Sequence, residues 1–198
     1  MVVLVSGTGS NLQALHAACE RREVPGFVAG VVADRPCPAV EWAGSVNIPW
    51  MVLEPGTFDS RDKWSRALLE RLLEVQADVV ISAGFMRILA PVFVDWYFGR
   101  LINIHPSLLP AFPGAHAVRD ALAAGVKVTG STVHYIDHLV DHGPIIMQTP
   151  VQVEDNDTEI SLHERIKEAE HEMLPQVCSL LLENRIGMEG DRTYIKAL

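Results

Sequence analysis

The sequence has little of several features that would assign it to a special class of protein. Its three cysteines, Cys19, Cys37 and Cys178, are few, odd in number and without Cys-x-x-Cys spacing. No uninterrupted apolar run approaches the ~18 residues of a membrane span, and no basic and then apolar signal peptide opens the chain. These absences argue against a disulfide-rich secreted domain and against a membrane protein. A reduced, cytoplasmic protein is the simplest interpretation.

Positive charge is also scarce. The chain has 16 Lys and Arg residues against 25 Asp and Glu residues, a net charge of −9, which argues against binding to nucleic acid or to an anionic membrane. A phosphorylated small molecule stays compatible, because a few backbone N–H groups and one lysine can bind phosphate locally. With 198 residues and 48% hydrophobic residues, the chain fits one soluble domain over residues 1–198. The sequence leaves open whether it is a monomer or a homodimer.

Apolar periodicity predicts alternating strands and helices in the first half. Short β-branched or apolar runs predict strands at residues 2–5, 28–33, 50–53, 78–82 and 100–104. Apolar residues repeated every three or four positions predict helices at residues 11–22 and 60–75. This alternation is typical of an α/β, Rossmann-like fold with a mostly parallel twisted sheet and helices on both faces.

The second half changes character. We expect a Gly/Pro-rich loop and a short helix in residues 111–126, an antiparallel strand pair at residues 131–135 and 145–153, and a long helix at residues 158–186. Ser161 and Glu164 have the spacing of a capping box for that helix. Pro175 is expected to kink or divide it.

A glycine-rich turn, residues 7–11, separates the first strand from the first helix. Free backbone N–H groups at such a helix start favour an anion, so a phosphate monoester would fit. A dinucleotide site is the competing interpretation, because Asp34 ends the second strand, but Leu12 replaces the third glycine of that fingerprint. A plain tight turn is the third.

The segment Asn103–Pro110 and the later Asp141 contain the most reactive set of side chains. Asn103 and His105 fall at the end of an expected strand, where open α/β sheets bind their ligands, and Pro106 restricts the backbone there. The set offers an amide, an imidazole and a carboxylate without a nucleophilic Ser or Cys. Such groups can hold an oxyanion and move protons while the amine of a substrate attacks a carbonyl carbon. Asp141 would supply a negative charge that favours imidazolium at His105.

The run Asn103–Pro110 with Asp141–Pro144 after it resembles the formyltransferase family that uses 10-formyltetrahydrofolate. The opening Val5–Gln13 and the segment Gly84–Leu89 match the same family, and the likeness covers nearly the whole chain. The resemblance implies direct attack by an amine on the formyl group of 10-formyltetrahydrofolate, through a tetrahedral intermediate. The match in the opening segment implies that the amine is that of 5-phosphoribosylglycinamide, in purine biosynthesis.

The resemblance also assigns roles to residues. The catalytic residues would be Asn103, His105 and Asp141, with His134 in support. The phosphate and the amine of the acceptor would be bound by Gly9, Ser10, Asn11, Lys167 and Glu170. The folate would be bound by Arg61, Met86, Arg87, Ile88, Leu89 and Asn103. It further implies a cis peptide bond at Leu109–Pro110. From the residues alone, Lys167 and Glu170 could equally lie on a solvated helix face, and Met86–Leu89 could belong to the core.

Histidine content invites a metal site, which we do not expect. His134, His138, Asp141 and His142 have the composition of a zinc site, yet they fall on an alternating strand and a loop without a common face. His16, His163 and His171 are expected on helices as surface or structural residues.

Other functions stay open on the sequence. Within the family these are hydrolysis of 10-formyltetrahydrofolate and formylation of another amine, such as methionyl-tRNA or an amino sugar. The hydrolase usually has an extra N-terminal domain and the tRNA enzyme a further C-terminal one, and neither is expected here. A nicotinamide-dependent oxidoreductase and a silent nucleotide-binding module are the alternatives from another class. The first strand begins almost at residue 1, which departs from the family pattern and predicts a start slightly upstream.

Overall fold

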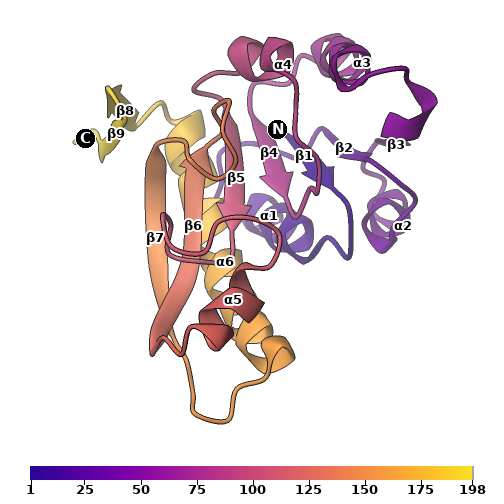
Figure 1. Cartoon of the computed structure of the whole chain (residues 1–198). Coiled ribbons are helices and arrows are strands. Elements are labelled where there is room, and N and C mark those ends of the chain that lie inside the picture. The colour runs from indigo at the N-terminus through magenta and orange to yellow at the C-terminus, as the bar shows by residue number, and fades with distance from the viewer. Residues whose placement is uncertain (198) are drawn as a thin grey trace.

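The computed structural model describes residues 1–197 and has one large sheet at its centre (Figure 1). Its parallel strands are β1 (Val2–Val5), β2 (Gly30–Ala33), β3 (Trp50–Val52), β4 (Val80–Ala83) and β5 (Leu101–His105), and its antiparallel strands are β6 (Val128–Tyr135) and β7 (Ile145–Gln152). They lie in the order β3-β2-β1-β4-β5-β6-β7. The expected α/β class and the expected antiparallel pair are therefore confirmed.

Helices cover both faces of the sheet. They are α1 (Ser10–Glu20), α2 (Pro38–Ser45), α3 (Arg61–Glu74), α4 (Pro91–Trp96), α5 (Ala117–Ala123) and α6 (Glu159–Leu182), with a short 3₁₀ turn η1 (Pro55–Thr57). Side chains alternate across a strand, so Val3 packs in one core with α1, α2 and α6, while Val2 and Leu4 pack in the other with α3 and α4. None of the helices within residues 1–197 combines the length and apolarity needed to cross a membrane.

The long last helix, α6, has a different capping box from the expected one and is not divided at Pro175. Its N-cap is Thr158, whose hydroxyl accepts from the Ser161 N–H at 3.1 Å while Ser161 Oγ accepts from the Thr158 N–H at 2.9 Å. The expected box at Ser161 and Glu164 is wrong by one turn, because the serine hydroxyl does the work expected of a longer acidic side chain. Pro175 does not divide the helix, which continues to Leu182. Burial of its neighbours Leu174 and Val177 against the sheet offsets the missing hydrogen bond.

The periodicity analysis did not find four short elements. They are α2, α4 and a terminal hairpin of β8 (Ile186–Glu189) and β9 (Arg192–Ile195). Both helices begin with a proline, which favours a first helical turn, but they are too short for a repeating apolar stripe. The helix expected to reach residue 186 ends at Leu182 instead.

The order of the strands creates a crevice in front of the sheet. The chain leaves β1 for α1 and then pairs β2 on one side of β1, whereas β4 lies on the other side. Because the chain continues in opposite directions from β1 and from β4, the loops that follow these two neighbouring strands diverge. Open α/β sheets bind their ligands in the crevice between such loops. The loops after β1, β4 and β5 therefore meet at one edge.

The loop between β6 and β7 leaves the sheet beside the start of β5, because Tyr135 pairs with Ile102, and it is held close to the sheet. The Tyr135 N–H donates to the Pro144 carbonyl oxygen at 2.9 Å. A Cβ atom added to Gly143 would overlap the carbonyl oxygen of Tyr135. Only glycine fits at this position, which lies two residues after Asp141.

We therefore predict that Gly143→Ala destabilises the fold, because backbone atoms must move apart to admit the methyl group. The loss should be about 1–3 kcal/mol in the free energy of unfolding, measured by urea denaturation. Gly56→Ala is the matched control, since open space surrounds that position. Equal stability of the two variants would contradict the close approach described here.

Candidate active site

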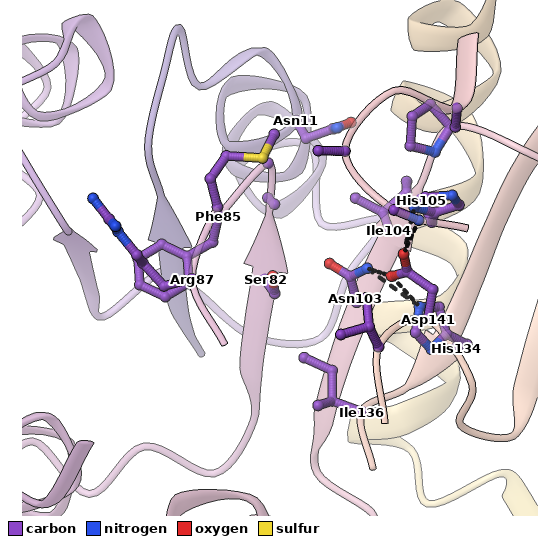
Figure 2. Close-up of a pocket in the computed structure, with 18 of the residues that line it drawn as sticks. Asn11, Ser82, Phe85, Arg87, Asn103, Ile104, His105, His134, Ile136 and Asp141 are labelled. Carbon is purple, nitrogen blue, oxygen red and sulfur yellow. Dashed lines mark hydrogen bonds and ion pairs between the residues drawn. The ribbon is translucent and has the colours of Figure 1, made fainter. Parts of the chain in front are cut away.

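A cavity of about 690 Å³ opens at the edge where β1, β4 and β5 end. Its lining comes from the glycine turn, the segment after β4, the end of β5, the loop after β6 and one face of α6. Figure 2 shows Asn103, His105, His134 and Asp141 grouped together, with Phe85 and Arg87 on the opposite side. The cavity thus joins segments that are far apart in the sequence.

His105 ends β5 and is 5% exposed. Its Nε2 lies 2.9 Å from the carbonyl oxygen of Phe112, and a carbonyl only accepts, so this nitrogen has the proton. Its Nδ1 lies 3.5 Å from Asp141 Oδ2. In a neutral ring that nitrogen would turn a lone pair toward a carboxylate, so the contact is attractive only when His105 is the imidazolium.

Asp141 has a left-handed backbone with φ 50°, a conformation that aspartate tolerates better than most residues. Its Oδ2 accepts from the Gly114 N–H at 2.7 Å, which ties the loop after β6 to the loop after β5. Its Oδ1 lies 3.4 Å from Asn103 Nδ2. The carboxylate therefore faces both side chains at the end of β5.

The amide of Asn103 is oriented by His134. The His134 Nδ1 donates to the Tyr135 carbonyl oxygen at 2.8 Å, so its Nε2 is an acceptor and lies 3.2 Å from Asn103 Nδ2. Burial lowers the pKa of His134 and keeps the ring neutral. Both amide hydrogens of Asn103 thus have acceptors within reach. The ring of His134 lies beside the Asn103 amide, next to the expected catalytic residues. Leu109–Pro110, in the loop that follows, is cis as expected.

Gly9, Ser10 and Asn11 line the cavity at the start of α1. Gly9 is the N-cap with φ 76°, and a Cβ atom there would meet the side chain of Ala39 at 2.7 Å. No side chain caps this helix start, so its first N–H groups are available to an anion. The Asn11 side chain is committed elsewhere, because its Nδ2 donates to Glu170 Oε2 at 2.8 Å.

Glu170 is buried, 4% exposed, rather than on a solvated helix face. Its Oε1 lies 3.2 Å from Ser131 Oγ, which also lies 3.0 Å from the His105 carbonyl oxygen. Serine has one proton, so both contacts are satisfied together when Glu170 is protonated and donates to Ser131. Burial raises the pKa of Glu170, in agreement with that arrangement. Glu170 has no ion pair among residues 1–197, so its ionised form would bind a cationic amine.

Lys167 lines the cavity one turn before Glu170 and forms an ion pair with Glu164 at 2.6 Å. His163, one turn earlier, lines the cavity too, and burial together with Lys167 lowers its pKa. His163 was expected only as a surface or structural residue, and its place in the cavity lining was not predicted. Its four-residue spacing from Lys167 was the available signal, since that spacing repeats on one helix face.

Met86, Arg87, Ile88 and Leu89 line the opposite side of the cavity, after β4. Met86 and Ile88 are 61% and 56% exposed, so they form an apolar rim rather than part of the core. Leu139 and Val140, just before Asp141, add to this rim at 61% and 56% exposure. Sequence reasoning missed these two residues, although two exposed aliphatic residues in a polar loop are a usable signal.

The structure bears on three further possibilities raised by the sequence: Arg61 in the cavity, a dinucleotide site at Asp34 and a metal site. Arg61 begins α3 and is exposed outside the cavity lining. Asp34 is buried under Arg35 and Arg87, which leaves no carboxylate oxygen open to a ribose hydroxyl of a dinucleotide. Within residues 1–197 no cluster of three or more His, Cys, Asp or Glu side chains could hold a metal.

Comparisons with known proteins agree with this geometry. The model of the formyl transferase family matches residues 1–178. A phosphoribosylglycinamide formyltransferase of Mycobacterium tuberculosis is 46% identical over 190 residues, which are 96% of this chain and 88% of the relative. Among solved structures, glycinamide ribonucleotide transformylase 1 from Symbiobacterium toebii superimposes with a TM-score of 0.97 at 42% identity and covers 99% of this chain and 93% of its own.

A relative with another activity has the same fold. A formyltetrahydrofolate deformylase from Pseudomonas syringae superimposes with a TM-score of 0.90 at 27% identity, over 99% of this chain and 65% of its own. The family match covers most of the chain, and the first relative exceeds 40% identity over nearly its full length. The chain belongs to the formyl transferase family.

Proposed function

We propose that the enzyme transfers the formyl group of 10-formyltetrahydrofolate to the amine of 5-phosphoribosylglycinamide, a step of purine biosynthesis, in the cytoplasm. The observation that carries the proposal is a single cavity with two unlike sides, an anion-binding helix start with Glu170 and an apolar rim at residues 86–89. Asn103, His105 and Asp141 lie between them. The names of the relatives at 42–46% identity give the same acceptor and the same formyl transfer.

On the acceptor side, the phosphate would bind at the N–H groups of residues 9–11, with Lys167 supplying a positive charge. Glu170 lies across from this turn, tied to it by Asn11. A phosphoribosyl amine has an anionic end and a cationic end. The two ends would match these two subsites, and the amine would face Glu170 and the end of β5.

On the donor side, the folate ring would lie against Met86, Ile88 and Leu89. The segment combines apolar side chains with backbone groups after Gly84, whose φ is 69°. Ligand pockets are mostly apolar with a few polar groups that fix orientation. The formyl group would then extend toward Asn103. We keep Arg61 as a proposed contact for an outer part of the folate, since it lies outside the cavity lining.

Asn103 and His105 would stabilise the charge that develops on the formyl oxygen. Asn103 Nδ2 and His105 Nδ1 lie 3.4 Å and 3.5 Å from Asp141, which is long for a hydrogen bond. Asp141 therefore holds these two donors only weakly, and they would be available to an oxyanion without a change in the position of either side chain. The amine nitrogen forms a bond to the formyl carbon, and the bond from that carbon to the folate nitrogen breaks.

Protons must balance in this reaction. The attacking amine loses one proton and the departing folate nitrogen gains one. Asp141 is the carboxylate nearest to both donors, and it would accept the first proton directly or through a water.

Hydrolysis of the folate is the second candidate, because a deformylase has the same fold. The test follows the absorbance of the folate with and without 5-phosphoribosylglycinamide. We expect conversion of 10-formyltetrahydrofolate only when the amine is present. Conversion without any amine would favour the hydrolase, and no conversion in either mixture would contradict formyl transfer.

His105→Ala and Asp141→Asn are each predicted to lower kcat by about 100-fold or more, because oxyanion stabilisation and proton transfer contribute on that scale. The KM of both substrates should stay within a few-fold. His142→Ala is the control, since this exposed histidine of the same loop pairs with Asp137. Turnover above about a tenth of the wild-type value in either variant would show that the roles are wrong.

Glu170→Gln should separate stability from binding. The neutral form of Glu170 is favoured by burial, so its stabilisation is complete below the ordinary pKa of 4.5 and is lost as the pH rises above it. Without ligand, the free energy of unfolding of the variant should be higher than that of the wild type at pH 7 by on the order of 1 kcal/mol. This difference should vanish toward pH 4. The KM for the amine should rise about tenfold or more. Denaturation across this pH range and steady-state kinetics provide the measurements, and an unchanged pH dependence of stability would refute the account of Glu170.

A further inference from the structure

The segment of residues 84–89 forms a wall of the cavity, yet few of its side chains are held by the core. Met86 and Ile88 are mostly exposed, whereas Phe85 and Leu89 are buried in the core that α3 and α4 cover. The exposed middle of the segment therefore needs another support if it is to present a fixed surface. That support lies behind the cavity, at the ends of β1 and β2.

Asp34 directly follows β2, and its side chain is fully buried. Two arginines share it. Arg87 Nε lies 2.6 Å from Asp34 Oδ2, and Arg35 Nη2 lies 2.9 Å from the same oxygen. Figure 2 shows the Arg87 side chain directed away from Asn103 and His105, so its guanidinium anchors the segment rather than facing the reacting groups.

A second tie runs through Ser6, which directly follows β1. The Met86 N–H donates to Ser6 Oγ at 2.9 Å, and the Ser6 hydroxyl also contributes to lowering the pKa of Asp34. Two consecutive residues of the segment are thus tied to the ends of neighbouring strands, Met86 to Ser6 after β1 and Arg87 to Asp34 after β2. Ser6 and Asp34 themselves lie behind the cavity lining rather than in it.

We propose that Asp34 and Ser6 are positioning residues for the formyl donor, because they fix the segment of residues 84–89 against which the folate binds. This inference rests on the proposed function. It assigns to Asp34 a role on the donor side alone, since neither Asp34 nor Ser6 contacts the glycine turn, Lys167 or Glu170 through any hydrogen bond recorded for residues 1–197.

The charge on Asp34 is what makes the support strong. Burial by itself would raise the pKa of this carboxyl, but hydrogen bonds from Arg35, Arg87 and Ser6 outweigh burial and lower it. The carboxylate is therefore ionised at neutral pH. Loss of the charge would leave Arg87, whose side chain is 40% exposed, free to turn into solvent and release the segment.

The test compares Ser6→Ala and Asp34→Asn with Arg35→Ala. Arg35 pairs with the same carboxylate, but it belongs to the β2 side and not to the segment. If only about a tenth of the molecules keep the segment in its binding geometry, the apparent affinity for the donor falls about tenfold. We therefore expect Ser6→Ala and Asp34→Asn to raise the KM for 10-formyltetrahydrofolate about tenfold, with kcat and the KM for 5-phosphoribosylglycinamide within about twofold. Arg35→Ala should leave all three within about twofold.

Several outcomes would overturn the inference. Equal increases in both KM values, a fall in kcat alone, or an Arg35→Ala enzyme as impaired as Asp34→Asn would each indicate a general structural role. Ser6→Thr keeps the hydroxyl and should restore the donor KM, and failure to do so would also count against the proposal. If Asp34→Asn does not fold, the Ser6 variants decide. A wild-type enzyme without formyl transfer would instead refute the proposed function, so the two failures are distinguishable.

Discussion

The parallel pairing of β1 with β4 and of β4 with β5 decides where every functional group of this protein lies. Parallel strands end at the same edge, so the turn after β1, the segment after β4 and the end of β5 must meet there. Hydrophobic burial on both faces holds the three strands in register. The antiparallel strand β6 places His134 opposite Asn103, and the loop after β6 folds back so that Asp141 faces Asn103 and His105.

Three buried or nearly buried carboxylates around this edge differ in their surroundings, and the differences explain their uses. Asp34 has two guanidinium partners and serves as a fixed anchor. Glu170 has neutral hydrogen-bond partners, and burial raises its pKa, so its charge is best stabilised when a cationic ligand arrives. Asp141 lies between these cases, with one short bond from the Gly114 N–H and two long contacts to side chains that can be redirected.

Much of the fold and most of the site follow from local patterns. Strand ends predicted the position of Asn103 and His105, and the family-like segments contain part of the cavity lining, whereas Leu139, Val140 and His163 were missed. Short elements such as α2 could not be predicted from apolar periodicity, since eight residues contain only about two helical turns. Apolar periodicity also could not predict the hydrogen-bond partners of the polar side chains. The committed amide of Asn11 and the fixed orientation of Asn103 depend on Glu170 and His134, which lie 159 and 31 residues away along the chain.

The central claim is that two ligands share one cavity and meet at Asn103, His105 and Asp141. The most direct measurement is a crystal structure with 5-phosphoribosylglycinamide and a non-reactive analogue of the formyl donor. The account predicts the phosphate at residues 9–11, the folate ring against residues 84–89, and the amine and the formyl position side by side within reach of Asn103 and His105. Ligands in separate sites, or a formyl position remote from these side chains, would contradict it.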